Sequence, residues 1–300
     1  MKAVAFTEFG GPEVLRVLDL PEPHAGPGQV RVRVRAAGVQ PYDAAVRAGW
    51  EPPGLSLGWP RVPGNEFAGV VDEGSEDIEV GTEVLGFTAV QAAAEYIVVP
   101  ASDVTPKPPE MPWEVAGGFP AGTQTASIAL ETLRLREAET LLVHGAAGSV
   151  GAAAVQLAQL QGAKVVGTAS GENQGYLREL GATPIVYGEG LRDRIVAAAP
   201  QGIDVVLDGA GGPALDISLE LVKDRRRILT LVDHDRAAAL GVLVSKSGRS
   251  AARLAELAAL YAKGDLRFHV RRVYPYTEAA AAHREVETGH GRGKIVLTFS

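Results

Sequence analysis

Two hydrophobic patterns divide this chain. Residues 29–35 alternate polar and apolar side chains with a period of two, which predicts a strand with one face toward solvent. Residues 140–143 form a continuous apolar and β-branched run, which predicts a second kind of strand, followed by a glycine-rich turn. A helix is then predicted from about Ser149, because small and apolar residues recur at helical spacing: Val150, Ala154, Leu157 and Leu160.

These patterns predict two domains. Up to about residue 112 the chain is β-rich, with glycines between short apolar strands and a proline-rich linker at its end. Further on, strands alternate with helices, and the later predicted strands are 164–168, 185–187, 204–208 and 227–232, with strand, helix and strand again at 270–273, 277–287 and 294–299. We expect an α/β protein in which residues 1–112 and 266–300 form a β-rich domain and residues 113–265 a doubly wound parallel sheet.

The turn after residue 144 has the pattern of a dinucleotide-binding loop. Counted from Ala146 it reads A-x-G-x-x-G, with Gly148 and Gly151 at the other small positions. Small residues there allow a tight turn, bring a pyrophosphate close to main-chain N–H groups around Ser149 and Val150, and let helix and strand pack closely. A redox dinucleotide is therefore the predicted ligand. A glycine-rich turn without a ligand is the alternative, since 36 of the 300 residues are glycine.

Composition excludes several classes of function. The net charge of −7 argues against nucleic acid as a partner. The chain has no cysteine, so disulfides, thiolate metal sites and thiol nucleophiles are ruled out, and a reducing compartment such as the cytoplasm is expected. Residues 1–6 alternate like a strand and lack the apolar core of a signal peptide. The apolar stretch 141–160 contains glycine, histidine and glutamine, so we expect no membrane association.

Several motifs, spread along nearly the whole chain, together resemble those of a known protein family. They are residues 10–15 (GGPEVL), 41–49 (Pro41, Asp43, Arg47 and Gly49), 63–71 (PGNEFAGVV), 94–96 (AEY), the fingerprint helix, 282–283 (AH) and 289–297 (GHGRGKIVL). In this order they resemble the zinc-free medium-chain dehydrogenase/reductases of the quinone oxidoreductase (zeta-crystallin-like) type. The resemblance implies a GroES-like catalytic domain made of both chain ends, a Rossmann domain inserted between them, and a homodimer.

The tip of the second predicted strand of the dinucleotide domain favours NADPH. NAD-specific sites carry an acid there that binds the ribose 2′-hydroxyl. This chain instead has Ser170 and Asn173, which can both donate to a 2′-phosphate and which NADPH-dependent members of the resembled family often carry. Two features oppose this reading: some relatives have lysine where this chain has Gln174, and Glu172 would repel a phosphate if it turned inward. The resemblance places Tyr187 near the adenosine, and a buried strand-end tyrosine is the alternative.

The predicted chemistry is hydride transfer without a metal ion. Asn65 stands where zinc-dependent relatives have a histidine ligand, the six histidines are scattered, and cysteine is absent. His144, beside the fingerprint turn, is expected to pack rather than react. Without a Lewis acid, quinones and α,β-unsaturated carbonyls are the easier acceptors, because hydride addition at carbon places the negative charge on a conjugated oxygen that hydrogen-bond donors stabilise.

The candidate hydrogen-bond donors lie in the loop 40–43, and Asn65 is a further candidate catalytic residue. Gln40 replaces the family's common asparagine and is expected to contact both cofactor and substrate. Tyr42 is a candidate phenol donor, with a stacking or surface aromatic as the alternative. Asp43 is expected to pair with Arg47 one helical turn later. Further cofactor contacts are expected, from the resemblance and from strand ends, at Thr125, Gly209, Leu231 and Val232.

Other functions stay open at this point. The departures at Gln40 and Ala45, where some relatives have tyrosine, favour a nucleotide-binding protein without turnover. A scaffold protein that keeps only the fold, and an enoyl reductase acting on a larger biosynthetic substrate, are further alternatives. Trp50, Trp59 and the loop 51–58 either line an apolar pocket or anchor the core. Residues 241–245 predict a late strand whose apolar edge a second subunit would cover if it lies at the side of the sheet.

Overall fold

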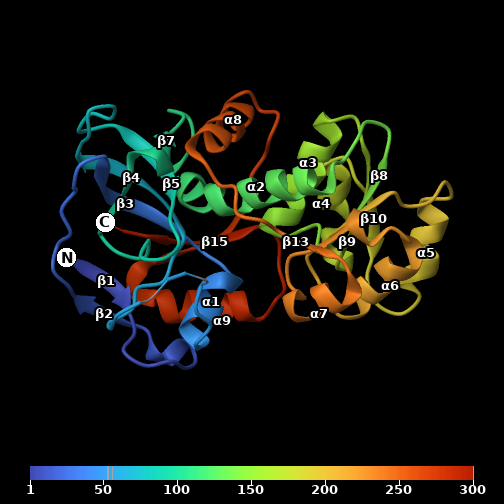
Figure 1. Ribbon diagram of the computed structural model, residues 1–300, viewed down its shortest axis with the longest axis horizontal. Coiled ribbons are helices and arrows are strands. Elements are labelled where there is room, and N and C mark those ends of the chain that lie inside the picture. Colours follow the sequence, from blue (N-terminus) through green and yellow to red (C-terminus); the bar gives the residue numbers. More distant parts are fainter. Residues whose placement is uncertain (53, 56, 300) are drawn as a thin grey trace. The chain divides into compact units, whose positions relative to one another are not determined.

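The computed structural model describes residues 1–52, 54–55 and 57–299, so Pro53 and Ser56 of the predicted pocket loop lie outside the described residues. The chain forms two compact units (Figure 1). Unit 1 contains residues 1–121, 250–264 and those from 269 onward, and unit 2 contains residues 122–249 and 265–268. This division differs from the expected boundaries in three places, because residues 113–121 and 250–264 belong to unit 1 and residues 266–268 to unit 2. The first change falls inside the helix α2 (Trp113–Leu133), and α8 (Ala251–Ala262) belongs to unit 1, where it packs against β7 (Val104–Pro106).

A seven-stranded sheet is the framework of unit 1. Its order is β14-β15-β3-β4-β5-β7, with β6 paired to β3. The remaining bounds are β3 (Gln29–Val39), β4 (Glu66–Glu73), β5 (Glu83–Phe87), β6 (Tyr96–Pro100), β14 (Val270–Pro275) and β15 (Lys294–Thr298). Neighbouring strands are antiparallel except β14 and β15, which are parallel. A separate two-stranded sheet joins β1 (Lys2–Ala5) to β2 (Arg16–Asp19).

The period-two pattern has the expected consequence in β3. Val30, Val32 and Val34 are buried in the core of unit 1, while Arg33 between them is exposed. Arg31 is not merely solvated, because its guanidinium makes two hydrogen bonds of 2.8 and 2.9 Å to the carboxylate of Asp72 on β4. The alternating part therefore supplies one apolar face, as the sequence indicates.

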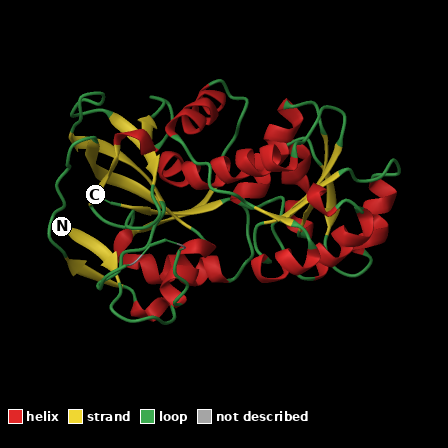
Figure 2. Cartoon of the chain, viewed as in Figure 1, coloured by secondary structure: helices red, strands yellow, loops and turns green. Residues whose placement is uncertain are grey.

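Unit 2 is a doubly wound parallel sheet. Its order is β10-β9-β8-β11-β12-β13, and all five pairings are parallel. The strands are β8 (Thr140–His144), β9 (Lys164–Ala169), β10 (Thr183–Val186), β11 (Val205–Asp208), β12 (Ile228–Thr230) and β13 (Leu243–Val244). Helices join consecutive strands (Figure 2): α3 (Ser149–Leu160), α4 (Gln174–Glu179), α5 (Leu191–Ala198), α6 (Pro213–Leu221) and α7 (His234–Leu240). The strand order reverses between β8 and β11, which creates the switch point where such sheets bind nucleotides.

The expected fold class is confirmed. A GroES-like β-rich unit and a Rossmann-type parallel sheet are both present, and the predicted strands differ from those observed by a few residues at their ends. The helix predicted over 277–287 begins as a short 3₁₀ turn, Tyr276–Glu278, and continues as α9 (Ala279–Glu287). Among the described residues, no helix combines the length and the apolar character needed to cross a bilayer.

The expected ion pair on the helix α1 (Pro41–Ala48) was wrong. Asp43 accepts hydrogen bonds from the backbone N–H groups of Gln40 at 2.9 Å and Gly64 at 3.1 Å. Arg47 instead pairs with Glu287 on α9, donates to the carbonyl of Gly10 at 3.0 Å, and lies 3.1 Å from Nδ1 of His283. Arg47 is 1% exposed, so partners from distant segments replace the solvent that it loses.

The Arg47–His283 contact requires a neutral imidazole. The Arg47 guanidinium can only donate, so Nδ1 of His283 must accept. Burial and, to a smaller degree, the charge of Arg47 lower the pKa of His283 from 6.5 to about 3. Below pH 6.5 the unfolded chain therefore binds a proton at this position that the folded chain refuses until the pH approaches 3.

We predict that this histidine contributes to acid destabilisation. The contribution of neutral His283 to the free energy of unfolding is fully present above pH 6.5. It decreases as the pH falls, and between pH 7 and pH 4.5 the loss from His283 alone is about 2–3 kcal/mol. Urea denaturation at these two pH values should show a smaller loss for His283→Gln, since its amide oxygen still accepts from Arg47. An equal loss in the wild type and in this variant would contradict the prediction.

Candidate functional site

One candidate site is the turn between β8 and α3 in unit 2. Gly148 is the N-cap of α3 and contributes no side-chain hydrogen bond to the first amides of that helix. The N–H groups of Ser149, Val150 and Gly151 begin the helix, where backbone donors lack intrahelical acceptors and the helix dipole is positive. This arrangement suits an anion such as a pyrophosphate.

The third small residue of the fingerprint is fixed by steric contact. A methyl group added at Gly151 would lie 2.7 Å from Cα and 3.0 Å from the carbonyl carbon of Ala146. Since these atoms are backbone, the helix would have to move away from the turn. Gly151 therefore has the close-packing position expected from the sequence.

The ends of β8 and β11 meet at the switch point. These two strands are neighbours, with His144 opposite Asp208, and the N–H of Gly209 donates to the carbonyl of His144 at 3.1 Å. The predicted residue Gly209 thus lies beside the fingerprint turn. Thr125 lies on α2, one turn after Gly122, where an added methyl group would be 3.2 Å from Cβ of Ser149. Gly209 and the turn of α2 that precedes Thr125 therefore lie beside the start of α3.

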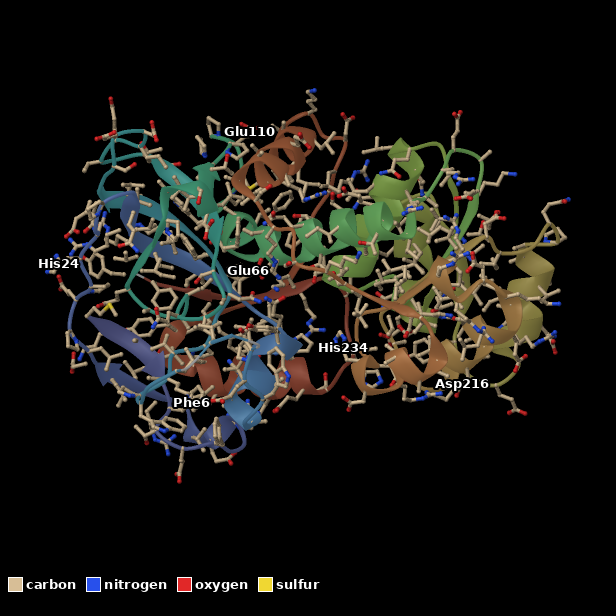
Figure 3. The ribbon with its side chains drawn as sticks, in the orientation of Figure 1. Phe6, His24, Glu66, Glu110, Asp216 and His234 are labelled. Atoms are coloured by element: carbon tan, nitrogen blue, oxygen red, sulfur yellow. The ribbon has the colours of Figure 1, made fainter. Side chains whose placement is uncertain are left out.

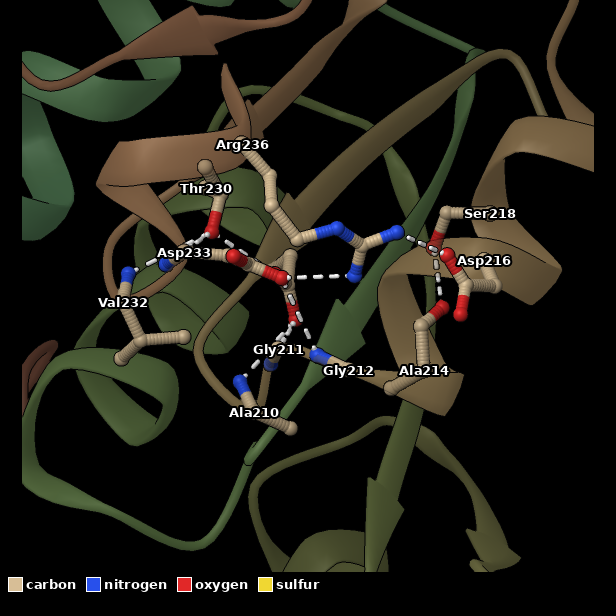
Figure 4. Close-up of polar contacts among 11 residues, drawn as sticks. Ala210, Gly211, Gly212, Ala214, Asp216, Ser218, Thr230, Val232, Asp233 and Arg236 are labelled. Atoms are coloured by element: carbon tan, nitrogen blue, oxygen red, sulfur yellow. Dashed lines mark hydrogen bonds and ion pairs between the residues drawn. The ribbon is translucent and has the colours of Figure 1, made fainter. Parts of the chain in front are cut away.

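A buried carboxylate shapes the two loops at this edge. Asp208 is fully buried, and one of its oxygens accepts from the N–H of Gly211 at 2.8 Å while the other accepts from the hydroxyl of Thr230 at 2.8 Å. The Thr230 oxygen in turn accepts from the N–H of Asp233 at 3.0 Å, and Asp233 accepts from the N–H of Gly212 (Figure 4). The loops after β11 and β12 are therefore tied to each other.

This polar network was missed from the sequence, although it positions two predicted residues. Leu231 and Val232 belong to the loop after β12, and the Leu231 N–H donates to the carbonyl of Asp208 at 2.8 Å. The sequence signal that could have revealed this network is Asp208 itself, an aspartate directly after the apolar run 205–207 at the carboxyl end of a parallel strand.

His144 packs, as expected. Its ring is 1% exposed and lies 3.0 Å from the hydroxyl of Thr168 and 3.1 Å from that of Ser218. Ser218 donates to the carbonyl of Ala214, so its oxygen accepts from Nε2 of His144, and Nδ1 accepts from Thr168. Burial lowers the pKa of His144 to about 4, which keeps the ring neutral at physiological pH.

The tip of β9 carries the predicted ribose-binding residues. The Asn173 amide donates to the hydroxyl of Ser170 at 2.9 Å, so these two side chains form one polar group. Gln174 turns away from that group, donating to the carbonyls of Ala169 and Ser170, and Glu172 is exposed. Tyr187 is 47% exposed, which excludes the alternative of a buried strand-end tyrosine.

A second candidate region is a buried polar cluster in unit 1. Glu66, labelled in Figure 3, begins β4 and forms an ion pair with Lys294, the first residue of β15. The Lys294 ammonium also donates to Oε1 of Gln40 at 3.1 Å. The amide nitrogen of Gln40 donates to Oδ1 of Asn65, which is 3% exposed. Two predicted residues, Gln40 and Asn65, are therefore in direct contact.

Glu66 and Lys294 were missed as site residues. Glu66 is fully buried and Lys294 is 2% exposed. The remaining Glu66 oxygen accepts from the N–H of Ala121 at 2.6 Å. The backbone makes room for the pair, since a methyl group at Gly38 would lie 2.7 Å from Cε of Lys294. The signal was a charged residue at the start of each of two apolar strands, but the sequence gives no indication that these residues meet.

A neighbouring carboxyl group is held at an unusual pKa. Asp43 is 1% exposed, and this burial raises its pKa to about 7 against the opposing effect of Lys294. Both oxygens accept backbone hydrogen bonds that hold the start of α1 beside Gly64. Asp43 therefore positions the segment that carries Gln40 and Tyr42.

Tyr42 lies on the aromatic side of this region. Its ring makes an edge-to-face contact with Trp50, with centroids 5.3 Å apart, and it is partly buried against the core of unit 1. Trp59 contacts Phe6 and Phe9 in the same way, so it packs on the edge of the core and is 48% exposed. Tyr42 therefore makes the aromatic contact that was its alternative role, and Trp59 makes the core contact that was the alternative to a pocket lining.

The unit 1 cluster is a poor ligand set for a divalent cation. Among the described residues, no three His, Asp or Glu side chains are grouped as metal ligands require. Asn65 stands where zinc-dependent relatives have a histidine ligand, but its amide oxygen already accepts a hydrogen bond from Gln40. The ammonium of Lys294 brings a positive charge to the same cluster, which opposes a cation there.

Two family models and several known proteins match this chain. Residues 26–109 match the family model of the alcohol dehydrogenase GroES-like domain, and residues 180–297 match that of the zinc-binding dehydrogenases. A quinone oxidoreductase of Pseudomonas aeruginosa is 29% identical over 99% of both chains. The structure of the quinone oxidoreductase from Coxiella burnetii is 28% identical, with a TM-score of 0.89 over 100% of this chain and 99% of that one.

A further relative is much longer. The spectinabilin polyketide synthase system protein NorB of Streptomyces orinoci is 34% identical over 91% of this chain. The match covers 13% of that protein, so this chain corresponds to a small part of NorB.

We predict that the fingerprint turn does not tolerate a methyl group at Gly151. Gly151→Ala should lower the free energy of unfolding by about 1–3 kcal/mol, because backbone atoms must move apart. Gly175→Ala in α4 is the matched control, since nothing lies within 4 Å of an added methyl group there. Urea denaturation followed by circular dichroism measures both. Equal stability of the two variants would show that the close contact is not required.

Proposed function

The chain belongs to the medium-chain dehydrogenase/reductase family, in its quinone oxidoreductase group, and we propose that it transfers hydride from NADPH to a quinone or an α,β-unsaturated carbonyl without a metal ion. It is an oxidoreductase that uses a nicotinamide cofactor. The observation that carries the finer proposal is the buried cluster of two amides and an ammonium at Gln40, Asn65 and Lys294, which offers hydrogen-bond donors where zinc-dependent relatives hold a metal.

The residues of unit 2 fit a dinucleotide. When bound, NADPH would supply a hydride from C4 of its nicotinamide ring. The N–H groups of Ser149, Val150 and Gly151 would hold the pyrophosphate beside the small residues Ala146 and Gly148. At the ribose end, Ser170 and Asn173 would bind the 2′-phosphate and Tyr187 would cover the adenosine. The nicotinamide contacts in the proposal come from Gln40, Thr125, Gly209, Leu231 and Val232.

The residues of unit 1 fit the acceptor. The acceptor carbon gains the hydride with its two electrons, and the π pair of the conjugated system moves to the carbonyl oxygen. The amide donors of Gln40 and Asn65 stabilise that negative charge. Tyr42, which borders the core near this segment, or solvent supplies the proton that completes the reduction. The proposal places the enzyme in the cytoplasm, with a small molecule as its partner.

A second candidate function is enoyl reduction on a larger biosynthetic substrate. The similarity to NorB favours it, because that relative is part of a polyketide synthase system. The chemistry is the same, and the two candidates differ only in the size of the acceptor. A nucleotide-binding protein without turnover differs from both in its kinetics.

We predict turnover of NADPH with 1,4-benzoquinone, naphthoquinones or enones, followed as loss of absorbance at the reduced nicotinamide band. Prior dialysis against a strong metal chelator should leave the rate unchanged, because the cluster holds no ligand set for zinc. Binding of NADPH without turnover across the panel would favour the nucleotide-binding alternative. Loss of activity after chelation would overturn the metal-free proposal.

We predict that Ser170 contributes to cofactor choice. The wild type should have a lower KM for NADPH than for NADH, and Ser170→Asp should raise the KM for NADPH at least about tenfold through repulsion of the 2′-phosphate. Glu172→Gln is a control with the opposite expected effect. It removes a carboxylate near Ser170 and should lower the KM for NADPH. A wild type that prefers NADH would contradict the proposal.

We also propose a homodimer. β13 is the edge strand of the unit 2 sheet, and Val244 on it is 38% exposed. An exposed apolar edge is the kind of surface that a second subunit covers. Light scattering at working concentration should give about twice the chain mass of 31.3 kDa. A monomer would refute this assembly.

A further inference from the structure

The loop between β10 and α5 in unit 2 is held by one side chain. Nε of Arg194, on α5, donates to the carbonyl of Val186 at 3.1 Å. The two terminal nitrogens of the same guanidinium donate to the carbonyls of Glu189 at 2.8 Å and Gly188 at 3.4 Å. One side chain therefore bonds to the backbone on both sides of Tyr187.

The outer side of β10 explains why an arginine is useful there. β10 is the edge strand of the unit 2 sheet. The N–H of Tyr187 donates inward, to the carbonyl of Ala169 on β9 at 3.3 Å. Successive backbone groups of a strand alternate in direction, so the carbonyl of Val186 points outward, where the described sheet has no further strand. Arg194 supplies the donor that a neighbouring strand would otherwise provide.

Two glycines make this loop difficult to order. Gly188 and Gly190 have φ angles of 103° and 72°, which glycine adopts freely and other residues rarely do. A loop with such residues loses much conformational entropy when it is fixed. The planar guanidinium of Arg194 carries five N–H donors, so it can hold three carbonyls at once and offset that loss.

Tyr187 lies toward the end of the sheet where the base of a dinucleotide would extend. The fingerprint turn follows β8, Ser170 follows β9, and β10 is the next strand in the same direction. A dinucleotide with its pyrophosphate at the first position and its ribose at the second would bring its adenine toward the third. Tyr187 directly follows β10, and its 47% exposed ring is accessible for stacking on a base.

We propose that Arg194 is a positioning residue for cofactor binding, which fixes the loop 187–190 so that the ring of Tyr187 is in place before the adenosine arrives. This inference rests on the proposed function, because it takes a nicotinamide dinucleotide as the ligand. Ordering the loop in advance removes an entropy loss from the binding step. The adenosine is common to NADPH and NADH, so Arg194 strengthens the binding of both coenzymes alike.

The first test measures the Kd of NADPH and of NADH by the fluorescence of the reduced nicotinamide. Arg194→Met keeps an unbranched stem and removes the donors. It should raise both Kd values about threefold to tenfold and leave their ratio unchanged. A rise for NADPH alone would show that the charge of Arg194 attracts the 2′-phosphate, and would overturn the positioning role. Two unchanged Kd values would overturn it as well.

A double-mutant cycle tests whether Arg194 acts through Tyr187. Tyr187→Ala removes the ring that the loop carries. In that background Arg194→Met should change the Kd of NADPH by less than about twofold, because the group that it positions is already absent. An equal rise in the presence and in the absence of the tyrosine ring would contradict the proposal.

Arg192 is the matched control on the same helix. Its side chain is 53% exposed and pairs with Glu220 at 3.0 Å and with Asp193 at 3.4 Å. Arg192→Met removes the same charge two residues away and should keep both Kd values within about twofold of the wild type. If it weakened binding as much as Arg194→Met does, net charge would account for the effect and the positioning role would be wrong.

Hydrogen exchange provides a readout in the free protein. The N–H of Tyr187 donates to Ala169, and that of Leu191 donates to the carbonyl of Gly188 at 3.0 Å. Both amides should exchange at least about threefold faster in Arg194→Met than in the wild type. Unchanged exchange would show that Arg194 does not fix the loop. A wild type that binds neither coenzyme would refute the proposed function and this inference together, whereas normal binding by Arg194→Met would refute the inference alone.

Discussion

The polar cluster of unit 1 depends on one buried ion pair. Glu66 and Lys294 meet with almost no solvent around them, a situation in which desolvation can outweigh the attraction between the charges. Two hydrogen bonds support the pair: the N–H of Ala121 donates to Glu66, and the ammonium of Lys294 donates to the amide oxygen of Gln40. The pair therefore links β4, β15, α2 and the N-cap of α1 through buried polar groups. The geometry of Gln40 and Asn65 follows from it.

The nucleotide-binding half was largely predictable from the sequence, because its signals are local. The fingerprint needs only a strand, a short turn and a helix, and the spacing of Ala146, Gly148 and Gly151 is visible within six residues. The same holds for the alternation in β3, where Val30, Val32 and Val34 have the buried face that their period indicates. Fold class follows from such periods, together with the order in which they occur.

The other half was not predictable from local patterns. Lys294 lies 254 residues from Gln40, and nothing in either segment indicates the contact. The expected pair of Asp43 with Arg47 satisfied helical spacing, yet burial gave each residue stronger partners elsewhere. Asp208 was equally hidden, since its role depends on two loops that only the parallel sheet brings together. Long-range polar contacts therefore set the limit of what the sequence alone reveals.

The position of β15 has a consequence for biosynthesis. This strand lies between β14 and β3, so the unit 1 sheet lacks an interior member until residues 294–298 have left the ribosome. Strands β3 to β7 are made long before, and during that interval Glu66 has no counter-charge. The parallel sheet of unit 2 draws its strands from residues 140–244 and is complete earlier in translation. The nascent chain thus holds every strand of the unit 2 sheet while the unit 1 sheet still lacks β14 and β15.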